Sequence, residues 1–339
     1  MDSRDRIMEA LSGKAQDTPP VAIFTQSSTI GQMEATGASW PEAHRDPERM
    51  AKLGCAQAEI FGFESVRVPF DITAEAERLG CGVDLGTIDN PPFITSRVVT
   101  GDPCEGTLSE LDLMDLSEYV SGGATAAVVE AVSLSAKRMA GKVAVCGGML
   151  GPMGLLGQLM SVESLALASF MDPEWIRRSS STLSALQAEY AKAMKDAGAD
   201  VLLIVESEAG ADIIDPSGYN DFSGSFMRSI IPSGDVKTVL HMCGSCEPIL
   251  GEIADCGVDA LSPDQKVPAE TIIEGLGGRI AVAGSVDPVG TLLLGGPDKI
   301  RKESRMYAEA GYEVIAPGCG IAPNTSNTNM RAFAGAFRD

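Results

Sequence analysis

Gly198-Ala-Asp200-Val201-Leu-Leu-Ile-Val205 is the stretch that decides the fold. A helical pattern ends at the glycine, an acidic residue follows, and an apolar strand begins without polar alternation. Glycine suits the left-handed position that closes a helix, and a continuously apolar strand is typical of a parallel sheet buried on both faces. The same phrase recurs at Gly62-Phe-Glu64, Gly257-Val-Asp259 and Gly311-Tyr-Glu313, each before a short apolar run. This repetition predicts a series of βα units.

Eight apolar segments, separated by helical patterns, are expected to be strands. Together they predict an α/β fold, a single-domain (β/α)8 TIM barrel over residues 1–339 with an N-terminal helical extension. No G-x-G-x-x-G motif follows any of them, which excludes the simplest dinucleotide-binding fold. The Gly-, Pro- and Thr-rich segment Asp84–Asp102 is expected to be an excursion over one face of the barrel. The expected strands are Val21–Thr25, Ser65–Val68, Val143–Gly147, Val201–Val205, Thr238–Met242, Ala260–Ser262, Ile280–Gly284 and Val314–Pro317.

The composition limits the functions open to the chain. Its 339 residues include 47 Asp and Glu against 26 Lys and Arg, a formal net charge of −21. Such a chain repels phosphate backbones, so nucleic-acid binding is not expected. No apolar run reaches the length of a membrane span, and the polar start Met1–Asp5 predicts no signal peptide. Eight cysteines without an export signal favour reduced thiols in the cytoplasm.

Three residues point to a metal. His241, one of only two histidines, stands two positions before Cys243 at the end of the fifth expected strand, and Cys319 follows the eighth. Residues two apart on a strand share a face, and both strand ends are carboxyl ends, where TIM-barrel active sites lie. Two thiolates and an imidazole suit Zn²⁺, and three protein ligands leave one position open, as in catalytic sites. Cys246 remains a rival ligand, and buried cysteines are often only small core residues.

The charge of this ligand set predicts the nucleophile that the metal would serve. Zinc with two thiolates and a neutral imidazole has no formal net charge, so it is a mild Lewis acid better suited to a thiol than to water. Coordination would deprotonate an incoming thiol near neutral pH. The sequence therefore predicts alkyl transfer to sulfur, with the metal orienting the nucleophile.

Four stretches of the sequence carry a resemblance to a known family: Trp40–His44, Val66–Ala76, His241–Gly244 and Ala316–Pro323. They are similar to the methylcobamide:coenzyme M methyltransferases of methanogenic archaea, in the uroporphyrinogen decarboxylase superfamily, and the similarity runs nearly end to end. The resemblance implies a TIM barrel, zinc bound by His241, Cys243 and Cys319, coenzyme M as acceptor thiol, and a methylated corrinoid protein as donor in methylotrophic methanogenesis. Homocysteine or another thiol is the alternative acceptor.

The resemblance also implies roles for several further residues. In this family an acidic residue can complete the zinc shell, and Asp264 is the candidate; capping a helix is its alternative role. Asp71 resembles the catalytic aspartate of the decarboxylase branch. Asp71 and Arg67 would line the corrinoid-facing pocket, or would form a buried structural ion pair. Gly148 and Met149, at the end of the third strand, would border the methylcobamide, or the glycines there only form a turn.

Two other functions are weighed against methyl transfer. The decarboxylase branch needs N-terminal arginines for a substrate with many carboxylates, and no arginine occurs between Arg6 and Arg45. This departure argues against uroporphyrinogen decarboxylation. A corrinoid-binding or metal-storage subunit without activity is the alternative from a different class. The oligomeric state does not follow from the sequence.

Overall fold

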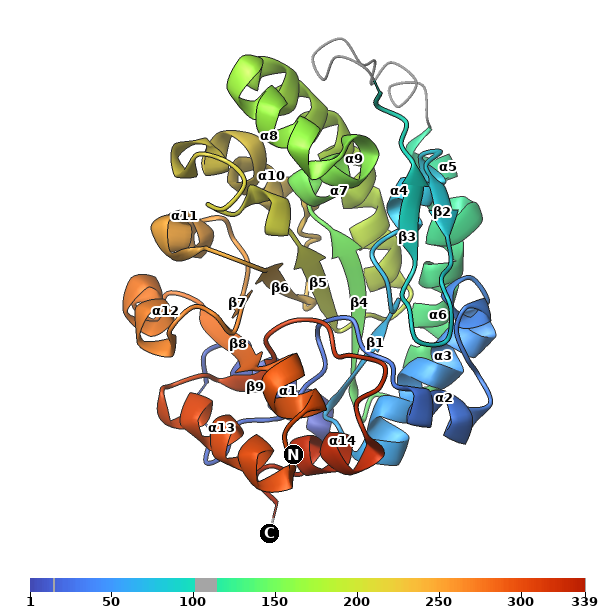
Figure 1. Ribbon diagram of the computed structural model, residues 1–339, viewed down its shortest axis with the longest axis vertical. Coiled ribbons are helices and arrows are strands. Elements are labelled where there is room, and N and C mark those ends of the chain that lie inside the picture. Colours follow the sequence, from blue (N-terminus) through green and yellow to red (C-terminus); the bar gives the residue numbers. More distant parts are fainter. Residues whose placement is uncertain (15, 101–114, 339) are drawn as a thin grey trace.

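Seven parallel strands form the central sheet of the computed structural model, which describes residues 1–14, 16–100 and 115–338 (Figure 1). Their order is β1-β4-β5-β6-β7-β8-β9, and each pair of neighbours is parallel. Seven of the eight expected strands are thereby confirmed, with ends shifted by a few residues at most. The strands are β1 (Ser65–Val68), β4 (Ala144–Leu150), β5 (Val201–Val205), β6 (Lys237–Met242), β7 (Ala260–Pro263), β8 (Ala281–Val286) and β9 (Val314–Pro317).

The first expected strand is wrong as a regular strand, although its residues stand in a strand's place between β9 and β1. A single bridge joins Val21 to Ile315 of β9, because Pro20 has no N–H to give to the ladder. On the side that faces β1, the hydroxyl of Ser65 takes the place of a backbone hydrogen-bond partner. It accepts from the N–H of Ile23 at 2.8 Å and donates to the Ile23 carbonyl at 3.0 Å. This segment closes the barrel.

Helices surround the sheet and confirm the predicted single-domain (β/α) barrel, with α1 as its N-terminal extension (Figure 1). Aspartates cap two of these helices: Asp46 accepts from the N–H of Arg49, and Asp172 from that of Trp175. The helices are α1 (Ser3–Ala10), α2 (Ile30–Thr36), α3 (Pro47–Ala56), α4 (Ala74–Arg78), α5 (Leu116–Ser121), α6 (Gly123–Met139), α7 (Pro152–Met160), α8 (Val162–Met171), α9 (Pro173–Asp196), α10 (Ser225–Ile230), α11 (Leu250–Asp255), α12 (Ala269–Leu276), α13 (Pro297–Glu309) and α14 (Asn327–Ala334).

The expected excursion is an antiparallel hairpin outside the barrel sheet. It consists of β2 (Gly82–Asp84) and β3 (Phe93–Ser96). The N–H of Val99 donates to the carbonyl of Leu159 in α7 at 3.1 Å. Since α7 follows β4, this contact holds the hairpin at the carboxyl end of the sheet. Positions 101 and 102 of the predicted excursion, and Cys104 beyond them, lie outside the described residues.

None of the described helices is by itself long and apolar enough to cross a membrane. Only α7 and α8 together reach that length and composition, and they are bent by 111° at the break between them.

Barrel closure gives a direct test of the Ser65 hydroxyl. Ser65→Ala would leave the buried N–H and carbonyl of Ile23 without the partner that Ser65 provides. We expect a loss of about 1–3 kcal/mol in the free energy of unfolding, measured by denaturant titration. Ser12→Ala is the control, because it removes an exposed hydroxyl that bonds only to the carbonyl of Met8. Equal stability of the two variants would contradict this account of closure.

Candidate metal centre

The structure brings His241, Cys243 and Cys319 together at the carboxyl end of the barrel. His241 Nε2 lies 3.1 Å from the Sγ of Cys243, which lies 3.2 Å from the Sγ of Cys319. The three ligand atoms are all within 4.8 Å of one another. Zinc bonds to nitrogen and sulfur are about 2.0–2.3 Å long, so one ion can reach all three atoms. The imidazole is buried, and the two cysteines are half-buried.

His241 is held in the tautomer that a metal needs. Its Nδ1 lies 3.0 Å from the carbonyl oxygen of Ser262 in β7 and 3.2 Å from the hydroxyl of the same residue. A carbonyl only accepts, so Nδ1 carries the ring proton and Nε2 presents its lone pair to the sulfurs. Ser262 of β7 therefore orients the imidazole of His241 in β6.

The turn that carries Cys243 is fixed by neighbouring loops. The N–H of Cys243 donates to the Ser207 hydroxyl at 3.1 Å, and the N–H of Ser245 donates to Asp212 at 2.7 Å. Gly244 has a φ of +78°, and a Cβ there would lie 2.3 Å from an oxygen of Asp212. Only glycine fits such a position without strain. The N–H of Gly244 donates to Asp264. Each of the three consecutive N–H groups of the turn therefore has a side-chain acceptor.

The third ligand, Cys319, is tied to the segment that closes the barrel. The Thr25 hydroxyl donates to the carbonyl of Cys319 at 2.8 Å, and the N–H of Gly318 donates to the carbonyl of Val286 at 2.9 Å. The hydrogen bond with Cys243 is the largest influence on the Cys319 thiol. This hydrogen bond outweighs burial and holds the pKa of Cys319 below its usual range. This sulfur ionises first, which suits a thiolate ligand.

Asp264 and Cys246 lie nearby but outside the three-residue group formed by the described part of the chain. The Asp264 carboxylate accepts from the N–H of Gly244 at 3.0 Å and from that of Lys266 at 2.9 Å. It therefore ties the loop after β6 to the loop after β7, and it does not cap a helix. Cys246 is fully buried, and burial raises the pKa of its thiol to about 12. An un-ionised core thiol is a poor metal ligand.

Asp71 is buried at the end of β1 among partners that the sequence did not indicate. Its carboxylate lies 3.0 Å from His44 Nδ1 and 3.2 Å from Arg45 Nη1, and it accepts from the Thr73 hydroxyl at 2.7 Å. Burial opposes ionisation, but the contacts with His44 and Arg45 prevail and hold the pKa of Asp71 well below its usual range. The alternative of an Arg67–Asp71 ion pair is wrong, because the basic side chains within ion-pair distance of Asp71, among the described residues, are those of His44 and Arg45.

Arg67 and Gly148 lie against each other on neighbouring strands. The guanidinium Nη1 donates to the carbonyl of Pro69 at 2.5 Å, whereas Nε and Nη2 are buried without a partner among the described residues. A Cβ on Gly148 would lie 2.3 Å from Nη2, so glycine makes room for the guanidinium and does not form a turn. Met149 follows within β4 and lines a small cavity with Gly148 and Tyr190.

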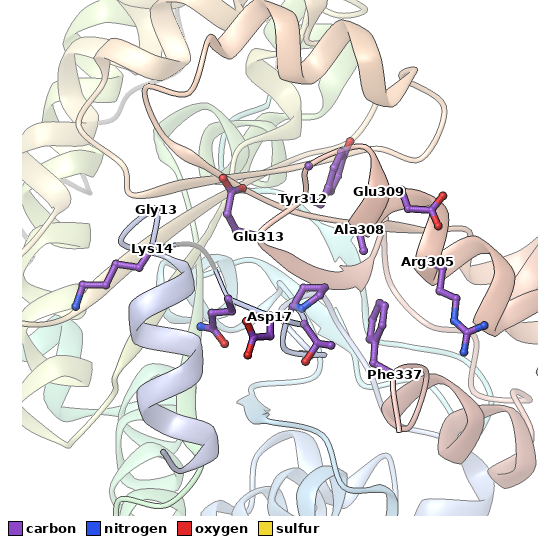
Figure 2. Close-up of a pocket in the computed structure, with 13 residues that line it drawn as sticks. Gly13, Lys14, Asp17, Arg305, Ala308, Glu309, Tyr312, Glu313 and Phe337 are labelled. Carbon is purple, nitrogen blue, oxygen red and sulfur yellow. The ribbon is translucent and has the colours of Figure 1, made fainter. Parts of the chain in front are cut away.

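A larger hollow lies at the opposite end of the barrel (Figure 2). This cavity of about 450 Å³ is lined by Asp17, Arg305, Tyr312 and Phe337 among others. It also touches Glu313, which directly precedes β9 and therefore marks the amino end of the sheet. The three ligand residues stand at carboxyl ends, so this hollow takes no part in the metal centre.

Comparisons with known proteins agree with this geometry. Residues 2–339 match the family model described as uroporphyrinogen decarboxylase (URO-D). "Methylcobamide:CoM methyltransferase MtaA" from Methanosarcina barkeri (strain Fusaro) is 35% identical over 336 residues, covering 98% of this chain and 96% of the relative. "Methylcobamide:CoM methyltransferase MtbA" from Methanosarcina acetivorans is 33% identical, covering 97% and 95%.

A solved structure extends the agreement to three dimensions. The "methyltransferase from Methanosarcina mazei" superimposes with a TM-score of 0.91 at 34% identity, covering 99% of this chain and 98% of that one. The likeness therefore includes the whole barrel and is not limited to the ligand motif. The chain belongs to the uroporphyrinogen decarboxylase (URO-D) family and, within it, to the group of the methylcobamide:CoM methyltransferases.

Proposed function

We propose that this chain transfers a methyl group from a methylated corrinoid to the thiol of coenzyme M, using zinc bound by His241, Cys243 and Cys319. One observation carries the proposal: two sulfurs and an imidazole nitrogen lie within 4.8 Å of one another at the barrel mouth. The names of full-length relatives describe the same transfer. The methyl donor would be a methylated corrinoid protein in methanogenesis, and the reaction would occur in the cytoplasm, where the cysteines stay reduced.

The residues of this chain would bind the metal and leave room for the acceptor. Zinc in this centre would lower the pKa of the acceptor thiol and so supply a thiolate near neutral pH. Ser262 keeps His241 Nε2 directed at the sulfurs. The half-buried cysteines leave the centre open toward the mouth. We assign the fourth position, before the acceptor arrives, to Asp264, whose carboxylate already binds the N–H of Gly244 beside Cys243.

In the proposed transfer, one bond forms on the acceptor and one bond breaks on the donor. The acceptor thiol would release its proton to solvent, and its sulfur would form a bond to the methyl carbon as the bond from that carbon to cobalt breaks. The electron pair of the broken bond stays on cobalt, and the product is a thioether. We place Asp71 and Gly148, at the ends of β1 and β4, on the side of the mouth that faces the corrinoid. Met149 alternates with Gly148 along β4 and lies beside Tyr190 of α9, so it faces away from the interior.

Removal of single ligands tests the metal centre. We expect His241→Ala and Cys319→Ala to lose stoichiometric zinc and methyl transfer from methylcobalamin to coenzyme M, because two remaining ligands bind the ion weakly. Zinc is measured by atomic spectrometry and product by chromatography. Cys246→Ala is the matched control, a buried cysteine three residues from Cys243, and should keep both zinc and activity. Full zinc and activity in the Cys319 variant would refute the proposal.

The Ser207 hydroxyl provides a milder test of the same centre. Ser207→Ala removes the acceptor of the Cys243 N–H, so the turn that positions this sulfur loosens. Loss of such supporting contacts typically lowers metal affinity about 10- to 100-fold, which competition with a chromophoric chelator would measure. Ser229→Ala, an exposed serine whose hydroxyl bonds to the carbonyl of Phe226, should leave affinity unchanged. Equal affinities would show that the turn needs no help from Ser207.

A further inference from the structure

The barrel interior holds a buried charge that has no ion-pair partner among the described residues. Arg67 is only 1% exposed, and of its guanidinium nitrogens only Nη1 has a described partner, the neutral carbonyl of Pro69. Asp71 is not within ion-pair distance of Arg67, since that carboxylate contacts His44 and Arg45, although its charge still favours the charged form of the guanidinium. Burial lowers the pKa of Arg67 to about 10, so the group stays charged near neutral pH. An unpaired buried charge is costly and is seldom kept without a function.

Strand register places this charge inside the barrel, on the same face as His241. Arg67 pairs with Cys146, Gly148 with Leu203, Leu203 with Val239, and Val205 with His241. Side chains two apart on a strand share a face, and paired residues in parallel strands do so too. A Cβ on Gly147 would meet Met194 of α9, whereas one on Gly148 would meet Arg67. The guanidinium therefore lies on the face away from α9, which is the interior.

We propose that Arg67 binds the acidic group of the acceptor thiol, a sulfonate or carboxylate, while the thiol end of the same molecule occupies the metal centre. This inference rests on the proposed function. The unpartnered Nε and Nη2 are two N–H donors of a planar fork, which matches two oxygens of such an acid group. Glycine at position 148 is what lets the guanidinium lie this close to β4, because a Cβ there would lie 2.3 Å from Nη2.

Binding at two points explains selectivity between thiols. The metal centre recognises sulfur alone, so by itself it would accept any small thiol. Arg67 adds a preference for a thiol with an acid group at its other end, because the buried guanidinium gains its missing counter-charge only from such a molecule. Coenzyme M, with a sulfonate two carbons from its thiol, meets both conditions, and 2-mercaptoethanol meets only the first.

The test compares acceptors in wild type, Arg67→Met and Arg67→Lys, each loaded with zinc. With methylcobalamin as donor, the ratio of kcat/KM for coenzyme M to that for 2-mercaptoethanol should fall about 10- to 100-fold in Arg67→Met, and less in Arg67→Lys. Arg138→Met, which removes an exposed guanidinium paired with Glu59, should leave the ratio unchanged. Arg67→Met should also melt no lower than wild type, because it removes an unpaired buried charge.

Two further measurements separate the alternatives. Isothermal titration of coenzyme M into zinc-loaded protein without a methyl donor should show the same weakening in Arg67→Met, so the inference can hold even if methyl transfer fails. Methylcobinamide, which lacks the corrinoid phosphate, replaces methylcobalamin in the second. If the Arg67→Met defect vanished with methylcobinamide, the arginine would serve that phosphate and the inference would be wrong. An unchanged acceptor ratio, or equal losses for both thiols with a lower melting temperature, would overturn it as well.

Discussion

The hydrogen bonds that join residues 20–23 to β9 and β1 are the constraint on which the mouth of this barrel depends. His241 ends β6 and Cys319 follows β9, so their side chains meet only if the sheet curls until its first and last members touch. Val21 bridges to Ile315, and the Ser65 hydroxyl bonds both backbone groups of Ile23. The Thr25 hydroxyl donates to the carbonyl of Cys319 and so links the closing segment to the third residue of the group. The geometry of the metal centre is therefore a consequence of barrel closure.

The loops around the centre show how an acidic chain uses its carboxylates. Asp212 and Asp264 accept backbone N–H groups of the turn after Cys243, groups that a sharp turn leaves without partners. Asp71 is satisfied by His44 and Arg45 at the end of β1. These carboxylates bind neighbouring backbone N–H groups and basic side chains, so the two sulfurs and the imidazole are the groups left to hold a metal. Zinc bound by two thiolates and a neutral imidazole would carry no net charge, which would favour a thiol as the nucleophile, in agreement with the family of the chain.

The interior then has two chemically different walls. The side chains of His241, Cys243 and Cys319 converge from β6 and β9. On β1, the Arg67 guanidinium lies against Gly148 of β4 and has no ion-pair partner among the described residues. An unpaired charge lowers stability, and chains commonly accept such a cost where function needs it. A substrate with sulfur at one end and an acid at the other would satisfy both walls at once. That complementarity links the metal centre to the rest of the barrel.

The sequence by itself determined the βα series, seven of the strands and the shared face of His241 and Cys243, because these follow from local periodicity and from glycine at helix ends. It also indicated Cys319 before Cys246 through their positions relative to strand ends. Only the tertiary structure decided that the first segment bonds through Ser65, that Asp71 pairs with His44 and Arg45, and that no described carboxylate forms an ion pair with Arg67. Those facts depend on which distant side chains point at each other once the barrel closes, and local patterns carry no information about direction across a closed sheet.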